Sequence, residues 1–475
     1  MSPSPPLTSL ECDHLCAWAE SPAALSVALG ETELPTAIRA LIWRLADAAD
    51  EAGPEGSAAI RQLFADLVEG WNDRLDAVGR QAYAAVFPAV VWRVAMGDTA
   101  LKARLHAFGL DGEQAFYAAY AARRRRSQDA APIIPDIVER IAVLSRVTIG
   151  ADVLLTSLLC QRLHQAFPGA EIVVLGDAKL SGLLGGLPQL RVQPLAYTRR
   201  GTLGQRLASW LTLGDALDEI DPSLVCSPDS RLDQLAVLPL VEEAWSYLHW
   251  ENIIDPAAPQ SLARALDGWA VQSLALGEEA GSCVPQVALA GPYVAQAAAW
   301  RAAFAADGVP TIAIKLDHGG NPAKALPRRL EVDLLRTAAA AGWRILLDAG
   351  FGEEELASSQ ELLAAAGLSA CEVDEGQPAA AAVLRFHGSI AGWAAALSAC
   401  QAAVAYDSVG HHLAGALGIP LLSLFTGHRH PAFPVAWAPQ GSAFIEQVVI
   451  PSGAGDQQIW QEAVLAALGK LLSRQ

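Results

Sequence analysis

The stretch between residues 401 and 427, QAAVAYDSVGHHLAGALGIPLLSLFTG, constrains the fold of this chain more than any other. An apolar run ends at Ala405, a turn of small and polar residues follows, and an apolar helical pattern then runs from His412 to Leu417. Gly418 ends that pattern, and a second strand-like run covers Leu421 to Phe425. Strand, turn, helix, glycine and strand in this order predict one βαβ unit, and therefore a parallel α/β sheet.

The turn that opens this helix has the features of an anion site. The first backbone N–H groups of a helix have no partner within the helix, and the helix dipole places positive charge at the same end. Ser408 adds a hydroxyl to these groups. We therefore expect the turn from Asp407 to His412 to bind a phosphate.

Length and charge limit the possible classes of protein. A chain of 475 residues is expected to form two or three domains, and its net charge of −18 argues against a nucleic-acid or anionic-membrane partner. The N-terminal residues lack a signal-peptide pattern, and no apolar run reaches the ~18 residues of a membrane span. Seven scattered cysteines without a CxxC pair indicate free thiols. We expect a cytoplasmic protein that is not integral to a membrane.

Residues 1–130 show apolar residues at three- and four-residue spacing, broken by Gly-Pro and Gly-Asp turns. This pattern predicts an all-α domain of five to seven helices. The basic run Arg123 to Arg126 closes it and is expected to be a solvated helix end, with a phosphate or partner contact as the alternative. Pro132 and Pro135 then indicate a linker. The helical domain is expected to recognise an acceptor or to contact another subunit, and its sequence does not choose between these roles.

Two α/β halves follow the helical domain. The first, residues 138–275, begins with a strand at 140–145, a helix from Val153 to Phe167 and a strand at 171–176, and we expect a helix at Ala244 to Ile254. The second half covers residues 283–455, and residues 456–475 are expected to form a closing helix. Strands of the second half are predicted at Gln286–Ala290, Thr311–Leu316, Trp343–Asp348, Ala402–Ala405 and Leu421–Phe425.

Asp407-Ser408, then His412 and the run LAGALGIP resemble the nucleotide-sugar signature of the heptosyltransferase-type glycosyltransferases, glycosyltransferase family 9. Where that family has a glycine after Asp-Ser/Thr, this chain has Val409, with Gly410 one position later. The resemblance spans about residues 138–475. It implies a GT-B fold, in which two Rossmann-like halves carry the acceptor side and the nucleotide-sugar donor side.

Asp152 stands in the segment SRVTIGADVLLTSLL. The resembled family has Gly-Asp-Val/Ile-Leu-Leu-Thr after its first strand, and the resemblance implies that this aspartate is the general base. Here Ala151 is inserted between Gly150 and Asp152. A base must lie within hydrogen-bond reach of the acceptor hydroxyl. The spacing alone favours a different role, a helix N-cap, for which aspartate is a preferred residue.

Lys324 follows a run of glycine, asparagine and proline after the predicted strand at 311–316. In the resembled family a lysine after a loop of small residues faces the diphosphate of the donor. A cation there stabilises the charge that develops on the leaving group, without a metal ion. Asn321 is expected to line the same pocket, and a solvated surface lysine is the alternative for Lys324.

The remaining candidate residues are expected at the donor. His412 either bonds a phosphate oxygen or braces its loop, His411 is expected to be structural, and Asp407 is expected to orient the turn or contact a sugar hydroxyl. Arg429 suits a phosphate, whereas the neighbouring histidines lack the acidic or cysteine ligands of a zinc site. We expect no metal and no cofactor. The donor-binding set is Asn321, Gly388, Asp407, Ser408, Val409, Gly410, His411, His412 and Arg429.

These residues lead to a first hypothesis, an inverting, metal-independent glycosyltransferase that moves a sugar from a nucleotide-sugar donor to a glycan, lipid-linked or protein acceptor. Asp152 and Lys324 are its catalytic candidates. The second hypothesis is a non-catalytic nucleotide-sugar-binding or scaffold protein, motivated by Val409 and the inserted Ala151. A third is a nucleotide-sugar epimerase on the same fold, for which the sequence offers no partner to Asp152.

Overall fold

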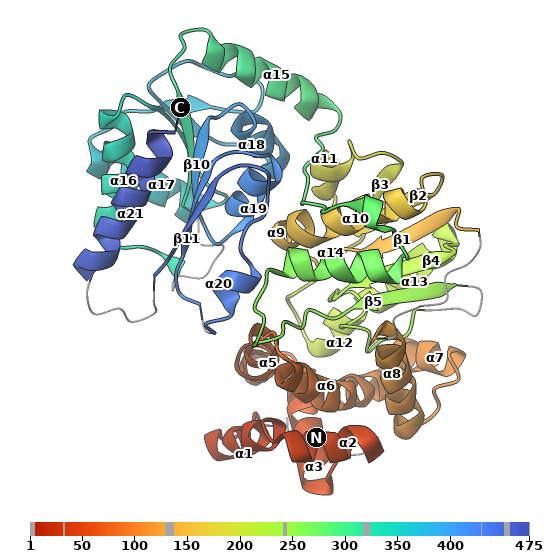
Figure 1. The fold of residues 1–475 in the computed structure, drawn as a ribbon. Helices are drawn as coiled ribbons and strands as arrows, with labels where there is room; N and C mark the ends of the chain where they lie inside the picture. Colours follow the sequence, from red (N-terminus) through yellow and green to blue (C-terminus); the bar gives the residue numbers. More distant parts are fainter. Residues whose placement is uncertain are drawn as a thin grey trace. The chain divides into compact units, whose positions relative to one another are not determined.

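The computed structural model describes residues 5–31, 34–128, 137–240, 245–316, 324–428, 430–450 and 457–474 (Figure 1). The chain divides into two compact units, which are described separately. The first unit comprises residues 1–147, 162–178 and 193–280. The second comprises residues 148–161, 179–192 and 281–475. Asp152 therefore belongs to the same unit as the turn that begins at Asp407.

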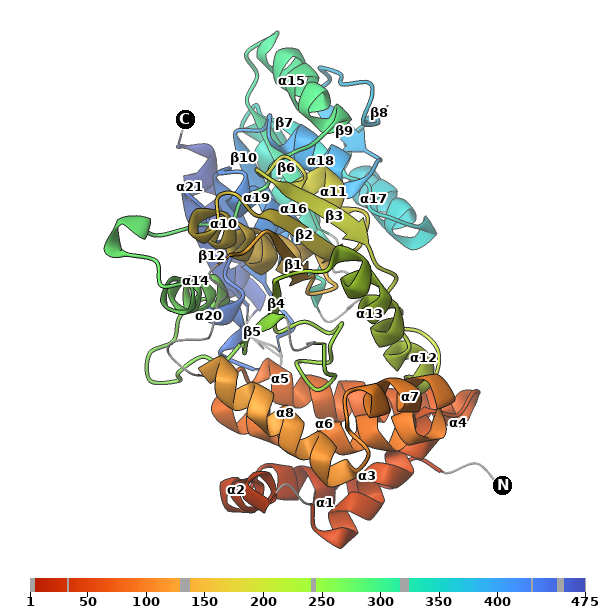
Figure 2. The same ribbon diagram turned by 90° about the vertical axis from the view of Figure 1, so that its right-hand side faces the viewer.

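The first described residues form a helical layer with more helices than the five to seven expected. One of them, α6, is mostly apolar and buried along most of its length, as expected of a helix at the centre of a layer. Figure 2 shows α6 beside α8. The helices are α1 (Ser9–Ala19), α2 (Pro22–Glu31), α3 (Thr36–Ala49), α4 (Pro54–Arg61), the π-helical η1 (Gln62–Val68), α5 (Glu69–Asp73), α6 (Ala77–Gly97), α7 (Thr99–Ala107) and α8 (Glu113–Gln128).

A five-stranded sheet follows the helices, with the strand order β3-β2-β1-β4-β5. The pairings of β1 with β2 and β4, and of β4 with β5, are parallel. One expectation was wrong: the segment 244–254 contains strand β5 rather than a helix, and its run of large residues pairs with β4. The strands are β1 (Arg140–Leu144), β2 (Glu171–Gly176), β3 (Leu190–Pro194), β4 (Leu224–Pro228) and β5 (Ser246–Trp250).

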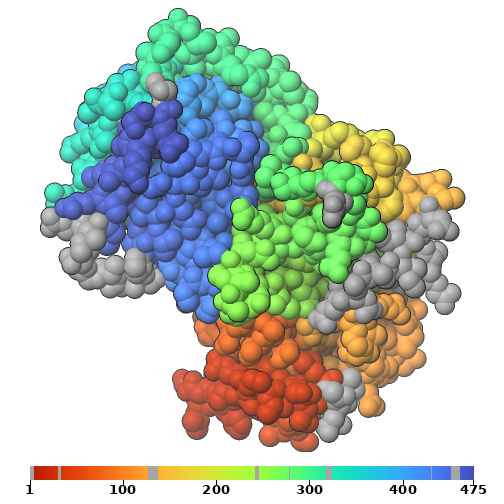
Figure 3. Space-filling model, viewed as in Figure 1, coloured from red at the N-terminus to blue at the C-terminus, as the bar shows by residue number. Residues whose placement is uncertain are grey.

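The helical layer and this sheet share one hydrophobic core. Buried side chains of the helices, such as Leu15 and Phe87, belong to the same cluster as Ala142 of β1 and Val225 of β4. In Figure 3 the helical layer, coloured red to orange, meets the green part of the first unit on the face in view. The helices are therefore built into the first unit rather than attached to it by a linker alone. Further helices here are α12 (Leu203–Leu207), α13 (Ser209–Ile220), α14 (Leu262–Ser273) and the 3-10 turn η3 (Glu278–Ala280).

The second unit holds a seven-stranded parallel sheet in the order β12-β11-β10-β6-β7-β9-β8. Its central strands are buried on both faces, as expected for a sheet covered by helices. The strand expected at Gln286–Ala290 is absent from this sheet, because Ala288 and Ala290 bond instead to residues 182–186. The strands are β6 (Thr311–Lys315), β7 (Arg344–Asp348), β8 (Cys371–Val373), β9 (Val383–Phe386), β10 (Ala402–Tyr406), β11 (Leu421–Phe425) and β12 (Ile445–Val449).

Helices complete the second unit, and α21 (Gln457–Leu472), the helix expected near the end of the chain, packs on α16, β11 and β12. The expected fold class, two α/β halves preceded by helices, is confirmed. The other helices are α9 (Ile149–Ala151), the π-helical η2 (Asp152–Thr156), α11 (Leu180–Leu184), α15 (Pro292–Ala305), α16 (Arg328–Ala340), α17 (Glu353–Ala366), α18 (Ile390–Leu397), α19 (Val409–Ala416) and α20 (Phe433–Ala436). Helix α10 (Ser157–Ala166) begins in the second unit, and its residues from Arg162 onward belong to the first.

Two observations concern the whole chain. Within the described residues, no single helix is long and apolar enough to cross a membrane, and α6 with α7 passes such a test only as a pair bent by 114°. All seven cysteines are free thiols.

Candidate functional site

The order of the second sheet identifies where a ligand is expected to bind. Strand β6 lies between β7, which follows it in the chain, and β10, so the direction of strand order reverses between β6 and β10. In open parallel sheets, ligands bind outside the carboxyl ends of the strands at such a reversal. Lys315 ends β6, and Asp407 and Ser408 directly follow β10. The predicted anion turn therefore lies at the reversal point.

Ser408 is the N-cap of α19. Its backbone is extended, with φ −152° and ψ −172°, and its hydroxyl accepts a hydrogen bond from the Gly410 N–H at 3.4 Å. A Cβ atom at Gly410 would lie 2.8 Å from Lys315 Cδ, so the absence of a side chain lets the lysine pass close to the turn. Strand, turn and helix form as the sequence predicts. Donor binding by Ser408, Val409 and Gly410 remains a prediction.

Lys324 is held at this turn rather than solvated. Its Nζ donates to the backbone carbonyl of Asp407 at 2.8 Å and to the Asp407 carboxylate at 2.7 Å. The lysine side chain is 20% exposed, and that of Asp407 only 7%. The carboxylate thus fixes the ammonium group at the carboxyl end of β10. Asn321 and Arg429, two further candidates, lie outside the described residues.

A second cation at the reversal point escaped the sequence analysis. Lys315 forms a buried ion pair with Asp348, the last residue of β7. Charged residues at the end of otherwise apolar strands are the signal that predicts this pair, because the carboxyl ends of neighbouring parallel strands lie side by side. Lys315 and Lys324 therefore both lie near the N-terminus of α19.

Two buried histidines, His411 and His412, lie in the first turn of α19, shortly after Ser408. His411 Nδ1 lies 3.0 Å from Ser423 Oγ, and its Nε2 lies 2.9 Å from His412 Nε2. Burial lowers the pKa of His411 to about 3, with a further contribution from Lys324. Burial and the neighbouring His411 also hold the pKa of His412 well below its usual value. Both rings are therefore neutral at pH 7. The expected structural role fits the contacts of His411.

Asp152 lies inside a helical segment that packs against α19. The N-cap of that segment is Thr148, so the N-cap alternative for Asp152 was wrong. Asp152 instead begins η2 and is fully buried, and Thr156 Oγ1 donates to its Oδ1 at 2.7 Å. A Cβ atom at Gly150 would lie 3.1 Å from His412 Cδ2, which shows how closely the two segments approach. The segment that bears Asp152 and the anion turn are thus neighbours, although the Asp152 carboxylate does not reach solvent.

Gly388 lies at the N-terminal end of α18, where the chain's own carboxylate already sits. Glu375 accepts a hydrogen bond from the Ser389 N–H, and a Cβ atom at Gly388 would lie 2.7 Å from Glu375 Cγ. Ser389 is the N-cap of this helix and accepts from the Gly392 N–H at 3.0 Å. Glu375 was missed by the sequence analysis, because no local spacing connects it to Gly388.

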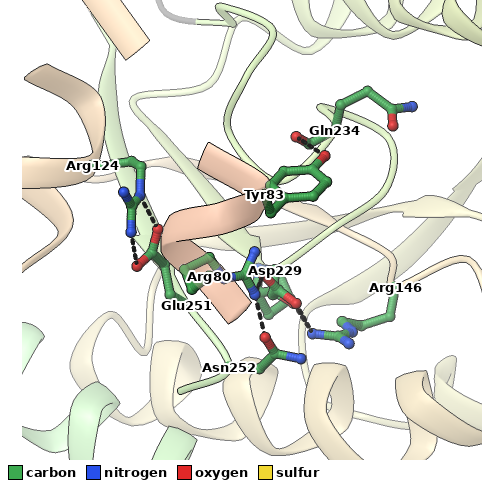
Figure 4. A network of polar contacts seen from close by, with 9 residues as sticks. Arg80, Tyr83, Arg124, Arg146, Asp229, Gln234, Glu251 and Asn252 are labelled. Carbon is green, nitrogen blue, oxygen red and sulfur yellow. Dashed lines mark hydrogen bonds and ion pairs between the residues drawn. The ribbon is translucent and has the colours of Figure 1, made fainter. Parts of the chain in front are cut away.

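The first sheet has its own reversal point, between β1 and β4, and the helical layer occupies it (Figure 4). Arg80 of α6 donates to the carboxylate of Asp229 and to Asn252, which follow β4 and β5. Arg146, just after β1, donates to Asp229 from the other side at 3.1 Å. Arg80 and Asp229 are only 3% and 4% exposed. An arginine from the helices is therefore buried where a Rossmann-like half usually leaves room for a ligand.

The basic run Arg123 to Arg126 was expected to be solvated, and for its first two residues this was wrong. Arg123 donates to the carbonyls of Ala236 and Val237. Arg124 donates to both carboxylate oxygens of Glu251, one of them at 3.0 Å (Figure 4). Burial raises the pKa of the Glu251 carboxyl, but the hydrogen bond and charge of Arg124 outweigh it, and the pKa falls to about 2. Both arginines join α8 to the sheet.

The segment after β4 is strained. Three consecutive residues, Gln234, Leu235 and Ala236, have positive φ angles of 52°, 56° and 66°. Such a conformation costs non-glycine residues about 1–2 kcal/mol each. Contacts from the helical layer hold the segment: Tyr83 Oη donates to the Gln234 carbonyl at 3.0 Å, and Arg123 donates to the Ala236 carbonyl. The helices therefore fix the backbone beside the first sheet's reversal point.

Solved structures of other proteins have a similar fold. The chain resembles a glycosyl transferase family 9 protein from Veillonella parvula DSM 2008, at 18% identity and a TM-score of 0.53, over 72% of this chain and 99% of that one. Two E. coli structures, ADP-heptose lps heptosyltransferase II and heptosyltransferase WaaC with ADP, match at 18% identity and a TM-score of 0.49, over 70% of this chain. They are covered over 98% and 99% of their own lengths. No protein-family model and no curated protein matched the sequence. The resemblance in fold to glycosyltransferase family 9 is confirmed.

Proposed function

We propose that this protein is an inverting, metal-independent glycosyltransferase that transfers a sugar from a nucleotide-sugar donor to an acceptor hydroxyl. One observation carries the proposal: at the reversal point of the second sheet, the N-terminus of α19 and the ammonium group of Lys324 lie together, and the segment that bears Asp152 packs on the same helix. An anion cradle and a carboxylate are the two parts that a direct transfer from a phosphate leaving group requires.

The donor diphosphate is expected to bind at the start of α19. Backbone N–H groups there, the Ser408 hydroxyl and the positive end of the helix dipole all favour an anion. Lys324 spends two hydrogen bonds on Asp407, and an ammonium group has three donors. The remaining proton can therefore serve a phosphate oxygen. As the bond between the sugar and the diphosphate breaks, its electron pair moves to the departing phosphate oxygen. The N–H groups of the turn and the Lys324 ammonium group stabilise the negative charge that develops there.

Asp152 is the proposed base. The acceptor oxygen attacks the anomeric carbon on the side opposite the diphosphate, so the configuration inverts, and its proton passes to the Asp152 carboxylate. Thr156 bonds one carboxylate oxygen, Oδ1, and orients the group. Because Asp152 is fully buried in this structure, the acceptor must displace neighbouring side chains to reach it.

The same burial favours the second candidate, a non-catalytic protein that binds a nucleotide sugar. A carboxylate without access to solvent cannot take a proton from an acceptor unless the segment moves. Val409 follows Ser408 where glycine is usual in the resembled family, and it stands 3.3 Å from a Cβ position at Gly150. Under this reading the protein holds its donor but does not turn it over.

Two measurements separate the candidates. A thermal-shift panel with UDP-, GDP-, ADP- and dTDP-sugars identifies the donor, because a ligand that binds only the folded state raises the Tm. Hydrolysis of that donor is then followed in the wild type and in Asp152→Asn, with Asp215→Asn, an exposed change on α13, as the control. Transfer is supported if donor turnover falls at least about 100-fold in Asp152→Asn and is unchanged in Asp215→Asn. Donor binding without turnover in any variant supports the non-catalytic candidate.

A further inference from the structure

The helical layer contains a cavity that has no part in the proposed transfer. It lies between α2, α6 and α8 and measures about 130 Å³. None of its lining residues belongs to the proposed donor or base site. The lining residues are Ala28, Leu29, Leu34, Ala84, Ala85, Tyr117, Tyr120, Ala121, Arg124 and Arg125.

Most of the cavity wall is apolar. Alanines of α2, α6 and α8 leave the space open, and Leu29 and Leu34 complete the apolar surface. An engineered apolar cavity of about 150 Å³ in another protein takes up benzene. The volume here therefore suits an apolar group of about the size of one benzene ring.

Each polar side chain among the lining residues carries a hydrogen-bond donor. Tyr120 is 2% exposed, and its hydroxyl has no hydrogen-bond partner among the described residues. Burial raises the pKa of this hydroxyl to about 12, so it keeps its proton. Arg124 and the exposed Arg125 bring two guanidinium groups, and Arg124 already pairs with Glu251. No acidic side chain belongs to the lining in the described part of the chain.

We propose that this cavity binds a small carboxylate whose apolar body is about the size of a benzene ring. The apolar body fills the space between the alanines, and the carboxylate accepts from the Tyr120 hydroxyl and pairs with Arg125 at the mouth. A buried hydroxyl without a partner costs free energy, and a bound carboxylate removes that cost. Guanidinium groups favour a carboxylate over a neutral group because the hydrogen bonds are charge-assisted.

One lining residue of the cavity also contacts the end of the first sheet. Arg124 lines it and at the same time donates to Glu251, which follows β5. A ligand in the cavity therefore packs beside the arginine that connects α8 to the first sheet. Because the ligand binds the folded state, its binding raises the Tm of the full-length protein, and the Tm continues to rise with ligand concentration above the Kd.

Benzoate, benzyl alcohol and acetate are the probes, titrated into the full-length protein by calorimetry, which measures saturation, with thermal shift as a second measure of stabilisation. We expect saturable binding of benzoate, with benzyl alcohol at least about tenfold weaker because it lacks the charge, and no saturable binding of acetate, because it lacks the apolar body. Benzoate that binds no better than benzyl alcohol, or that does not saturate, overturns the proposal.

Variants locate the binding. Arg125→Gln and Tyr120→Phe are each expected to weaken benzoate about tenfold, whereas Arg126→Gln, an equally exposed change on the next residue of α8, is expected to leave it unchanged. Ala121→Phe, which fills the cavity, is expected to abolish binding. Equal loss in Arg125→Gln and Arg126→Gln indicates nonspecific charge attraction and overturns the proposal. The two arginine variants decide the matter even if Ala121→Phe does not fold.

Discussion

Lys324 binds Asp407 twice, through the backbone carbonyl at 2.8 Å and through the carboxylate at 2.7 Å, and this double contact joins the end of β10 to the segment that precedes α16. Asp407 precedes the N-cap of α19, so the pair places a fixed cation next to the proposed phosphate site. The carboxylate also lies 3.6 Å from His411 Nε2. The pair therefore has a structural role as well as the proposed role in donor binding.

Lys324→Met is expected to lower both stability and donor affinity. Removing the ammonium group leaves the buried Asp407 carboxylate without its main partner, which costs about 2 kcal/mol in the free energy of unfolding, and removes a cation from the proposed phosphate site. Urea denaturation and titration of the donor found in the thermal-shift panel measure the two effects.

The control for this prediction is Lys470→Met, because Lys470 is 64% exposed and pairs with Glu446 at the surface of α21. This change is expected to cost less than about 0.5 kcal/mol. A Lys324→Met protein that matches Lys470→Met in both measurements would show that the pair with Asp407 contributes nothing.

The two buried histidines make stability depend on pH in a known direction. Their pKa values in the folded protein, about 3 for His411 and well below the usual value for His412, lie under the value near 6.5 of an unfolded chain. The unfolded state therefore binds protons first as the pH falls. The contribution is fully present above about pH 6.5 and is lost below it, by about 1.4 kcal/mol per pH unit for each histidine.

Urea denaturation at half-unit steps from pH 8 to pH 4.5 checks this dependence. The slope of the free energy of unfolding against pH is expected to fall by about 1.4 kcal/mol per pH unit below pH 6 in His411→Asn. Above pH 7 this slope is expected to be unchanged. An unchanged slope in this variant would mean that His411 takes up its proton in the folded protein as readily as in the unfolded chain.

The sequence predicts the α/β architecture because the decisive patterns are local. At residues 401–427 the strand, the turn, the glycine stop and the next strand all follow one another, and β10, α19 and β11 form there. The helical layer is likewise predicted from its spacing. By contrast, β5 was expected to be a helix, since the apolar and aromatic residues near Trp250 fit a helical spacing and only pairing with β4 settles their conformation.

Long-range contacts explain what the sequence does not predict. From its own helix Arg123 is expected to be solvated, yet it is half-buried and donates to the carbonyls of Ala236 and Val237, more than 100 residues later. The local sequence predicts that Asp152 is either an N-cap or a base. In the structure its helical segment packs on α19, and the Asp152 side chain is buried. No spacing within one segment carries this information.

Gly150→Ala tests the contact between the Asp152 segment and α19. The added methyl group would lie 3.1 Å from His412 Cδ2 and 3.3 Å from Val409 Cα, and the second neighbour is backbone that cannot move aside by rotating a side chain. We expect a loss of about 1 kcal/mol in the free energy of unfolding and weaker donor binding. Gly268→Ala is the matched control: it lies within α14, has nothing within 4 Å of the new methyl group, and is expected to stabilise the protein by about 0.5–1 kcal/mol. A Gly150→Ala protein as stable as this control would show that the two segments separate easily.

Arg80→Met tests whether the helical layer and the first sheet depend on one another. Arg80 and Asp229 are almost completely buried, so removing the guanidinium leaves Asp229 with Arg146 as its remaining cation and Asn252 without its donor. Breaking one side of a buried pair of this kind costs about 3–5 kcal/mol.

Arg93→Met is the control, because Arg93 and Asp47 are 43% and 36% exposed and such pairs contribute about 0–1 kcal/mol. We expect the helices and the first sheet to unfold together in urea, in a transition shifted strongly in Arg80→Met and barely in Arg93→Met, since these two parts share one core. Hydrogen exchange that shows the helices opening before the first sheet, with protection of the sheet unchanged by Arg80→Met, would show instead that the helices unfold independently.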